Sequence, residues 1–140
     1  MKQIPVIFWT GTGNTQMMAD AVAEAINAAG AEAVVKNVSE ITADEAAGYD
    51  ALALGCPAMG AEVLEECEFE PFFTELEGKL AGKKVALFGS YGWGGSYMQD
   101  WEARVKDAGA ELVAEGVLAL GAPDDEAVAK LAEAGKLLAE

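Results

Sequence analysis

Short apolar runs alternate with helix-periodic segments along this chain, and that alternation constrains the fold more than any other feature. Five runs have the character of strands and lie at 4–9, 33–38, 51–54, 85–88 and 111–120. Hydrophobic residues recur at helical spacing between them. This order is typical of a parallel sheet whose strands are buried on both faces. We therefore expect an α/β protein with a five-stranded parallel sheet.

The turns between these elements are short, and the sequence contains no repeat, linker or low-complexity segment. Residues 1–140 are therefore expected to form one domain. The last helix is expected to start in the acidic stretch 124–126, because acids favour a first helical turn. Four of its residues are predicted to face the core, and they are Val128, Leu131, Ala132 and Leu138.

The charge balance excludes several classes of function. Asp and Glu number 24 against 9 Lys and Arg, a formal net charge of −15, so nucleic acids and anionic membrane surfaces are not expected partners. The absence of His removes imidazole metal ligands and His-dependent nucleophilic catalysis. The longest uncharged run is too short to span a bilayer, and the two cysteines suit a reducing compartment. We expect a cytoplasmic protein without a metal site.

Three glycine-rich loops follow the first, third and fourth predicted strands, at 10–15, 55–60 and 89–95. The carboxyl ends of parallel strands share one edge of the sheet, where ligands of α/β proteins bind. The first loop combines hydroxyls, an amide and glycines at a helix N-terminus, an arrangement that favours a phosphate. It contains no Lys or Arg, which excludes a P-loop, and Gln16 replaces the third glycine of a dinucleotide fingerprint.

The other two loops offer contacts for a flat ring. Tyr91 and Trp93 stand among glycines in the third loop, which predicts stacking, with Trp93 the better candidate. Met59 brings a polarizable side chain to the middle loop, Gly60 a freely rotating peptide, and Glu62 a carboxylate acceptor.

These three strings, at 9–15, 55–60 and 89–94, resemble the cofactor loops of short-chain flavodoxins, especially those of clostridia-like anaerobes. The resemblance runs the whole length of the chain. It implies the flavodoxin-like three-layer sandwich, with strand order 2-1-3-4-5 and helices on both faces. It also implies FMN, rather than FAD, as the cofactor.

Carried over residue by residue, the resemblance assigns the phosphate to the first loop, the inner ring face to Met59 and the outer face to Trp93. Gly60 would turn its carbonyl toward N5–H of the reduced flavin, and Glu62 would accept from N3–H. Pro57 replaces a Ser of some relatives, which removes a phosphate contact, and Ala61 replaces an Asp. The expected cofactor-binding residues are Thr10, Gly11, Thr12, Gly13, Asn14, Thr15, Pro57, Ala58, Met59, Gly60, Ala61, Glu62, Ser90, Tyr91, Gly92, Trp93 and Gly94.

The function implied by the resemblance is that of a low-potential one-electron carrier without catalytic residues. Seven acids with no base between them would disfavour an anionic reduced flavin and attract the basic faces of redox partner enzymes, and they are Glu62, Glu65, Glu66, Glu68, Glu70, Glu75 and Glu77. A monomer is expected. The alternative is an FMN-dependent reductase of quinones or similar small substrates. A phosphorylated receiver module would need Asp at two strand ends, where this chain has Thr10 and Cys56-Pro57.

Overall fold

A parallel sheet forms the centre of the computed structural model, which describes residues 2–9, 13–57, 68–91, 96–120 and 122–140. Its strands pair in the order β2-β1-β3-β4-β5, with β6 also on β4, and all the pairings are parallel. The predicted fold class and strand order are therefore confirmed. The strand bounds are β1 (Gln3–Phe8), β2 (Glu32–Asn37), β3 (Ala51–Gly55), β4 (Lys84–Tyr91), β5 (Glu111–Leu112) and β6 (Val117–Leu120).

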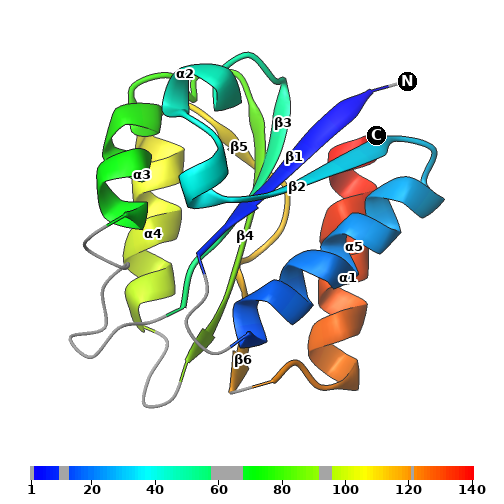
Figure 1. Ribbon diagram of the computed structural model, residues 1–140. Coiled ribbons are helices and arrows are strands. Elements are labelled where there is room, and N and C mark those ends of the chain that lie inside the picture. The colour runs from blue at the N-terminus through cyan, green and yellow to red at the C-terminus, as the bar shows by residue number, and fades with distance from the viewer. Residues whose placement is uncertain (1, 10–12, 58–67, 92–95, 121) are drawn as a thin grey trace.

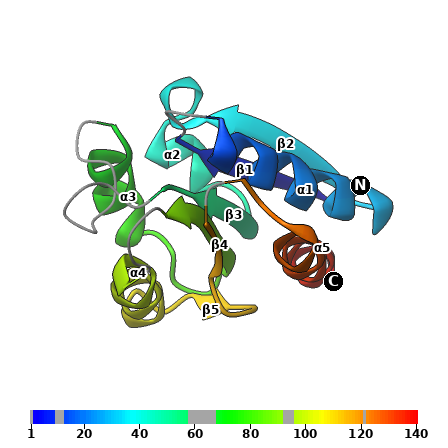
Figure 2. The same cartoon turned by 90° about the horizontal axis from the view of Figure 1, so that it is seen from below.

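Helices cover both faces of this sheet (Figures 1 and 2). Helices α1 (Asn14–Ala28) and α5 (Asp125–Ala139) pack on one face, and α3 (Phe69–Glu77) and α4 (Ser96–Asp107) pack on the other. A 3-10 helix, η1 (Val38–Glu40), and the short α2 (Ala43–Ala46) join β2 to β3. The sequence pattern did not predict these two, although Thr42 and Glu45 form a capping box at the start of α2.

Alternating side chains of the central strands form two separate cores. In β1, Val6 and Phe8 pack toward α1 and α5, whereas Ile7 packs toward α3 and α4. This period of two follows from the strand pleat. Helices α1 and α5 approach closely at Gly135, where a Cβ atom would lie 2.8 Å from the Val22 carbonyl oxygen. A larger residue at this position would force the two helices apart.

The edge strand β2 differs from the prediction that the strands are buried on both faces. Its residues are mostly half-buried, and Val35 is 39% exposed. Strand β2 pairs only with β1, since it lies at the end of the sheet. Burial on both faces therefore holds for β1, β3 and most of β4, which lie inside the sheet.

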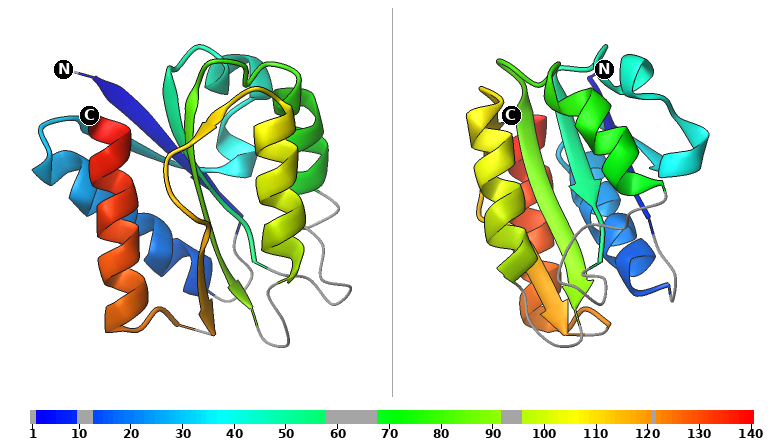
Figure 3. Two further views of the ribbon diagram at one scale, coloured as in Figure 1. Left: turned by 180° about the vertical axis from the view of Figure 1, so that it is seen from behind. Right: turned by 90° about the vertical axis from the view of Figure 1, so that its left-hand side faces the viewer.

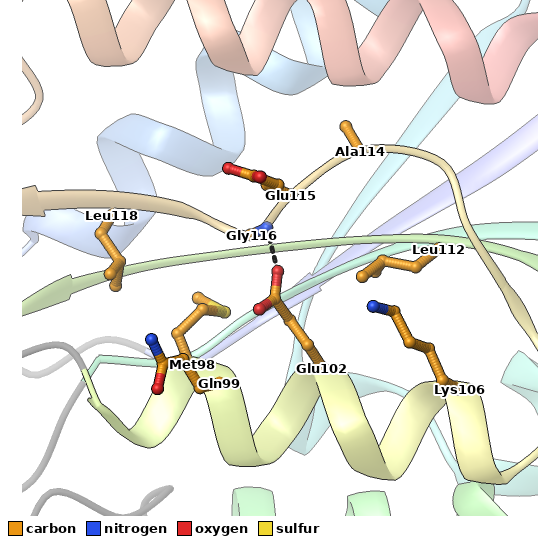
Figure 4. Close-up of a pocket in the computed structure, with 9 residues that line it drawn as sticks. All are labelled: Met98, Gln99, Glu102, Lys106, Leu112, Ala114, Glu115, Gly116 and Leu118. Carbon is orange, nitrogen blue, oxygen red and sulfur yellow. Dashed lines mark hydrogen bonds between the residues drawn. The ribbon is translucent and has the colours of Figure 1, made fainter.

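The predicted fifth strand, 111–120, is interrupted. Val85 pairs with Leu112 and Phe88 pairs with Val117, so four residues, 113–116, lie opposite only two residues of β4. Because the side-chain period of a strand is two, a two-residue bulge keeps Leu112 and Leu118 on the same face of the sheet. The bulge lies beside α4, and the Glu102 carboxylate accepts a 2.7 Å hydrogen bond from the Gly116 N–H (Figures 3 and 4).

The buried stripe of α5 corrects part of the predicted core. Leu131 and Leu138 are buried as predicted, but Val128 is 41% exposed and Ala132 is also exposed. Asp124 accepts a hydrogen bond from the Ala127 N–H and so sets where the helix begins. The face of α5 that packs against α1 and the sheet carries buried residues at helical spacing, and they are Ala127, Leu131, Ala134 and Leu138.

Candidate functional site

The carboxyl ends of β1, β3 and β4 lie at the edge of the sheet where α1, α3 and α4 begin (Figure 1). Phe8 of β1 pairs with Gly55 of β3, which pairs with Phe88 of β4. The ladder continues past these strand ends, because the Trp9 N–H donates to Gly55 and the Cys56 N–H donates to Phe88. The described parts of all three predicted loops therefore start from one rigid edge.

The first loop enters α1 through a left-handed glycine. Gly13 has φ 92°, a conformation that residues with a Cβ rarely adopt. The first turn of α1 contains no acidic residue, and no side chain among the described residues caps its N-terminus. The positive end of the helix dipole is therefore not offset by the helix's own side chains, which favours an anion there.

Two predicted site residues from different loops meet at this edge. The hydroxyl oxygens of Thr15 and Ser90 lie 3.3 Å apart in a buried hydrogen bond. Thr15 is 1% exposed and Ser90 is 7% exposed. Each hydroxyl keeps further hydrogen-bonding capacity, since a hydroxyl has one donor and two acceptor positions. The structure thus brings together the first and third loops at two neutral polar groups.

The third loop is shorter than predicted. Strand β4 runs on to Tyr91, so the segment 89–91 belongs to the sheet. Phe88, Ser90 and Tyr91 have parallel partners in β6, which explains the extension. Tyr91 is half-buried at the end of this strand, which corrects the prediction that it lies in the third loop.

Asn14 and Pro57, the other predicted site residues that the structure describes, are both half-buried. The remaining expected site residues lie outside the described residues, and they are Thr10, Gly11, Thr12, Ala58, Met59, Gly60, Ala61, Glu62, Gly92, Trp93 and Gly94.

Sequence reasoning did not predict a contact that joins the middle loop to α4. The Tyr97 hydroxyl donates a buried 2.8 Å hydrogen bond to the Cys56 carbonyl oxygen. Burial raises the pKa of Tyr97 well above its usual value, so this hydroxyl stays a donor. A Cβ atom on Gly89 would lie 2.1 Å from both oxygens. The glycine inside the strand pattern was the available signal, because such glycines often mark a close approach.

The predicted acidic cluster is partly neutralised. Arg104 of α4 pairs with Glu70 at 2.7 Å and with Glu77 at 3.0 Å, and its guanidinium lies over the Phe73 ring. Lys79 pairs with Asp44. The net field of the acidic segment is therefore weaker than a count of its carboxylates predicts. Among the residues that the structure describes, no three Cys, Asp or Glu side chains gather into a metal-binding group.

The sheet order, the left-handed glycine before α1 and the paired hydroxyls define an α/β protein with neutral polar groups and a helix N-terminus at the carboxyl edge of its sheet, where ligands of such proteins bind. The sequence model of the flavodoxin family, described as "Flavodoxin", matches residues 6–135. The chain belongs to the flavodoxin family.

Individual relatives are similar over nearly the whole chain. A flavodoxin of Clostridium beijerinckii is 47% identical over 135 residues, covering 96% of this chain and 97% of the relative. A flavodoxin of Megasphaera elsdenii is 46% identical and covers 82% and 85%. The solution structure of two-electron reduced Megasphaera elsdenii flavodoxin superposes with a TM-score of 0.89 at 42% identity, covering 97% of this chain and 98% of that structure.

Membership of this family defines the general activity. Flavodoxins bind FMN and transfer electrons to redox partner enzymes, so this chain is an FMN-dependent electron carrier and not an enzyme that turns over a substrate. The alternative of a substrate reductase is not favoured. No helix among the described residues is long and apolar enough to cross a membrane.

Proposed function

We propose that this chain is a low-potential, one-electron carrier that holds one FMN at the carboxyl edge of the sheet. The observation that carries the proposal is the buried hydrogen bond between Thr15 and Ser90, which joins the start of α1 to the end of β4. Neutral hydroxyls beside a helix N-terminus fit a phosphate monoester, because both donate hydrogen bonds to an anion. Bound FMN supplies the redox chemistry, and the protein supplies position and electrostatics.

In this proposal the first loop holds the phosphate. The donors are the N–H groups at the start of α1, which follow the left-handed Gly13, and the polar side chains of the loop. Those side chains are Thr10, Thr12, Asn14 and Thr15. Because these donors are fitted to a terminal phosphate, FMN should bind far more tightly than riboflavin or FAD.

The middle and third loops would hold the ring. Met59 would contact its inner face and Trp93 its outer face, while Glu62 would accept the N3 proton. The Gly60 peptide would offer its carbonyl to the N5 proton of the reduced ring, a contact absent from the oxidised state. A contact made by one redox state alone stabilises that state.

We propose that the physiological partners are redox enzymes with basic docking faces. The support is the net charge of −15, which attracts positively charged surfaces before contact. Within that segment Glu70 and Glu77 pair with Arg104, and the Glu68 and Glu75 side chains are exposed at the surface. The carrier would work as a monomeric, single-domain protein, 1–140, in the cytoplasm, where Cys56 stays a thiol.

A double variant, Thr12→Ala with Thr15→Ala, tests the phosphate assignment. It removes two hydrogen bonds to an anion, each worth about 1.5–3 kcal/mol. We expect the affinity for FMN to fall by at least about a hundredfold, since every 1.4 kcal/mol is about tenfold. The affinity for riboflavin, which lacks the phosphate, should stay unchanged. Titration of the apoprotein with each flavin measures both, and an unchanged preference for FMN over riboflavin would refute the assignment.

A further inference from the structure

The Tyr97 hydroxyl connects two parts of the chain that lead into different loops. Tyr97 stands in the first turn of α4, directly after the third loop, and Cys56 directly follows β3 at the start of the middle loop. Their hydrogen bond, at 2.8 Å, spans 41 residues of sequence and is buried. Trp93 precedes Tyr97 by four residues, and Met59 follows Cys56 by three. The bond therefore lies between the stems of the two loops assigned to the ring.

The surroundings leave this hydrogen bond little freedom. Tyr97 is 2% exposed, and its ring stacks on Trp101 at 6.5 Å between centroids. Trp101 in turn contacts Phe69 and Phe73 of α3 edge to face, at 5.5 Å and 5.9 Å. The ring of Tyr97 is thus held in place by an aromatic cluster that joins α4 to α3.

Strand β4 leaves room for this hydrogen bond because it has a glycine, Gly89, next to it. A Cβ atom at Gly89 would lie 2.1 Å from the Tyr97 hydroxyl and 2.1 Å from the Cys56 carbonyl oxygen. Both oxygens occupy the volume that any other residue's side chain would fill. The adjoining Cys56 N–H is held in turn by the Phe88 carbonyl at 3.1 Å. The peptides on both sides of Cys56 are therefore fixed, one by β4 and one by Tyr97.

We propose that Tyr97 is a positioning residue for the flavin ring, which it serves by fixing the Cys56 carbonyl and so the spacing between the stems of the middle and third loops. This inference rests on the assignment of Met59 and Trp93 to the two ring faces under the proposed function. Tyr97 itself is not required to touch the cofactor. Its hydroxyl acts through the peptide that it holds.

The test compares Tyr97→Phe with Tyr49→Phe in the complete chain. The first substitution removes only the hydroxyl that binds Cys56. The control removes a hydroxyl from a half-buried tyrosine that packs against the same core, at the other end of β3, and forms no side-chain hydrogen bond within the described residues. For each variant, the dissociation constants of FMN and riboflavin, the visible spectrum of the bound flavin and its two one-electron potentials are measured.

We expect Tyr97→Phe to weaken the binding of FMN and of riboflavin by the same factor, because both ligands share the ring. The factor should be about threefold to tenfold, since the substitution removes one buried hydrogen bond. The spectrum of the bound flavin and the spacing of its two potentials should change as well. Tyr49→Phe should leave all four readouts as they are in the unsubstituted protein. Incorporation of p-aminophenylalanine at position 97, which restores a donor at the same place, should restore them.

Two results would overturn the inference. One is a lower melting temperature for Tyr97→Phe with unchanged flavin affinities, spectrum and potentials, which would make the hydroxyl merely structural. The other is a loss of affinity for FMN alone, which would place its effect at the phosphate. The variant Trp93→Ala shows whether the inference about Tyr97 fails alone or the proposed function fails with it. If Trp93→Ala weakens the binding of both flavins and Tyr97→Phe does not, only the inference about Tyr97 fails. If Trp93→Ala changes neither affinity, the assignment of Trp93 to the ring is itself wrong.

Discussion

The guanidinium of Arg104 and the carboxylate of Glu70 form a bidentate ion pair between α4 and α3. Nη1 lies 2.7 Å from Oε1 and Nη2 lies 3.0 Å from Oε2. The same guanidinium donates to Glu77 near the end of α3, so one side chain binds both ends of the neighbouring helix. Parallel double hydrogen bonds of this kind are stronger and more directional than single ones.

We expect Arg104→Met to lower the free energy of unfolding by about 1–2 kcal/mol at neutral pH. This value lies between those of exposed and buried pairs, because the Arg104 and Glu70 side chains are 30% and 36% exposed. Urea unfolding of the apoprotein measures it. Lys130, whose exposed i,i+4 pair with Glu126 is weaker, provides the control variant Lys130→Met, which should change stability by less than about 0.5 kcal/mol.

The difference between Arg104→Met and the unsubstituted protein should depend on pH. The hydrogen bonds from Arg104 hold the pKa of Glu70 below its usual value. A carboxyl whose pKa is lower in the folded state contributes stability above its unfolded pKa, about 4.3, and loses it as the pH falls through the folded value. The two proteins should therefore differ most above about pH 5 and converge in more acidic solution. A constant difference down to about pH 3 would contradict this origin.

The hydrogen bond between Thr15 and Ser90 predicts coupled effects on binding. Thr15→Val and Ser90→Ala should each weaken the binding of FMN more than that of riboflavin. Their effects on the free energy of FMN binding should not add. We expect a coupling of about 0.5–1.5 kcal/mol, since each single change removes the bond that the two hydroxyls share. A double-mutant cycle on the FMN dissociation constant measures this coupling. Strict additivity would show that the two hydroxyls act independently.

The tryptophans should divide between cofactor binding and stability. Trp101 is 1% exposed within the α3–α4 core, so Trp101→Ala should lower the free energy of unfolding by about 3–5 kcal/mol. Trp93→Ala should instead release the flavin fluorescence that stacking quenches. Flavin emission at saturating FMN and urea unfolding of the apoprotein separate the two effects. The reverse pattern would mean that Trp101, rather than Trp93, contacts the ring.

Gly60→Val tests the proposed redox-dependent peptide. A β-branched residue disfavours any backbone conformation with positive φ by about 1–2 kcal/mol. Because only the reduced flavin would receive the proposed N5 contact, the first one-electron potential should fall while the oxidised protein keeps its FMN. A dithionite titration that follows the one-electron-reduced species by absorbance measures the change. An identical yield of that species would place the redox-dependent contact elsewhere.

Local patterns predicted the elements well where burial is uniform. The runs that became β1, β3 and β4 are apolar on both faces because they lie inside the sheet, and their predicted bounds agree within one residue except at the end of β4. That end runs on to Tyr91 because β6 pairs with it, a contact between distant segments. The exposure of Val128 was likewise not predictable, because it depends on which face of α5 packs against α1 and the sheet.

The sequence by itself determined the α/β order, the family and the types of group in the three loops, because these depend on periodicity and on residues close together in the chain. Only the tertiary structure decided which groups meet. Thr15 and Ser90 are 75 residues apart, Cys56 and Tyr97 are 41 apart, and Glu70 and Arg104 are 34 apart. Each pair meets because strands of one sheet end at the same edge or because neighbouring helices pack on one face. These meetings follow from strand order, which the family resemblance implied but which spacing along the chain does not encode.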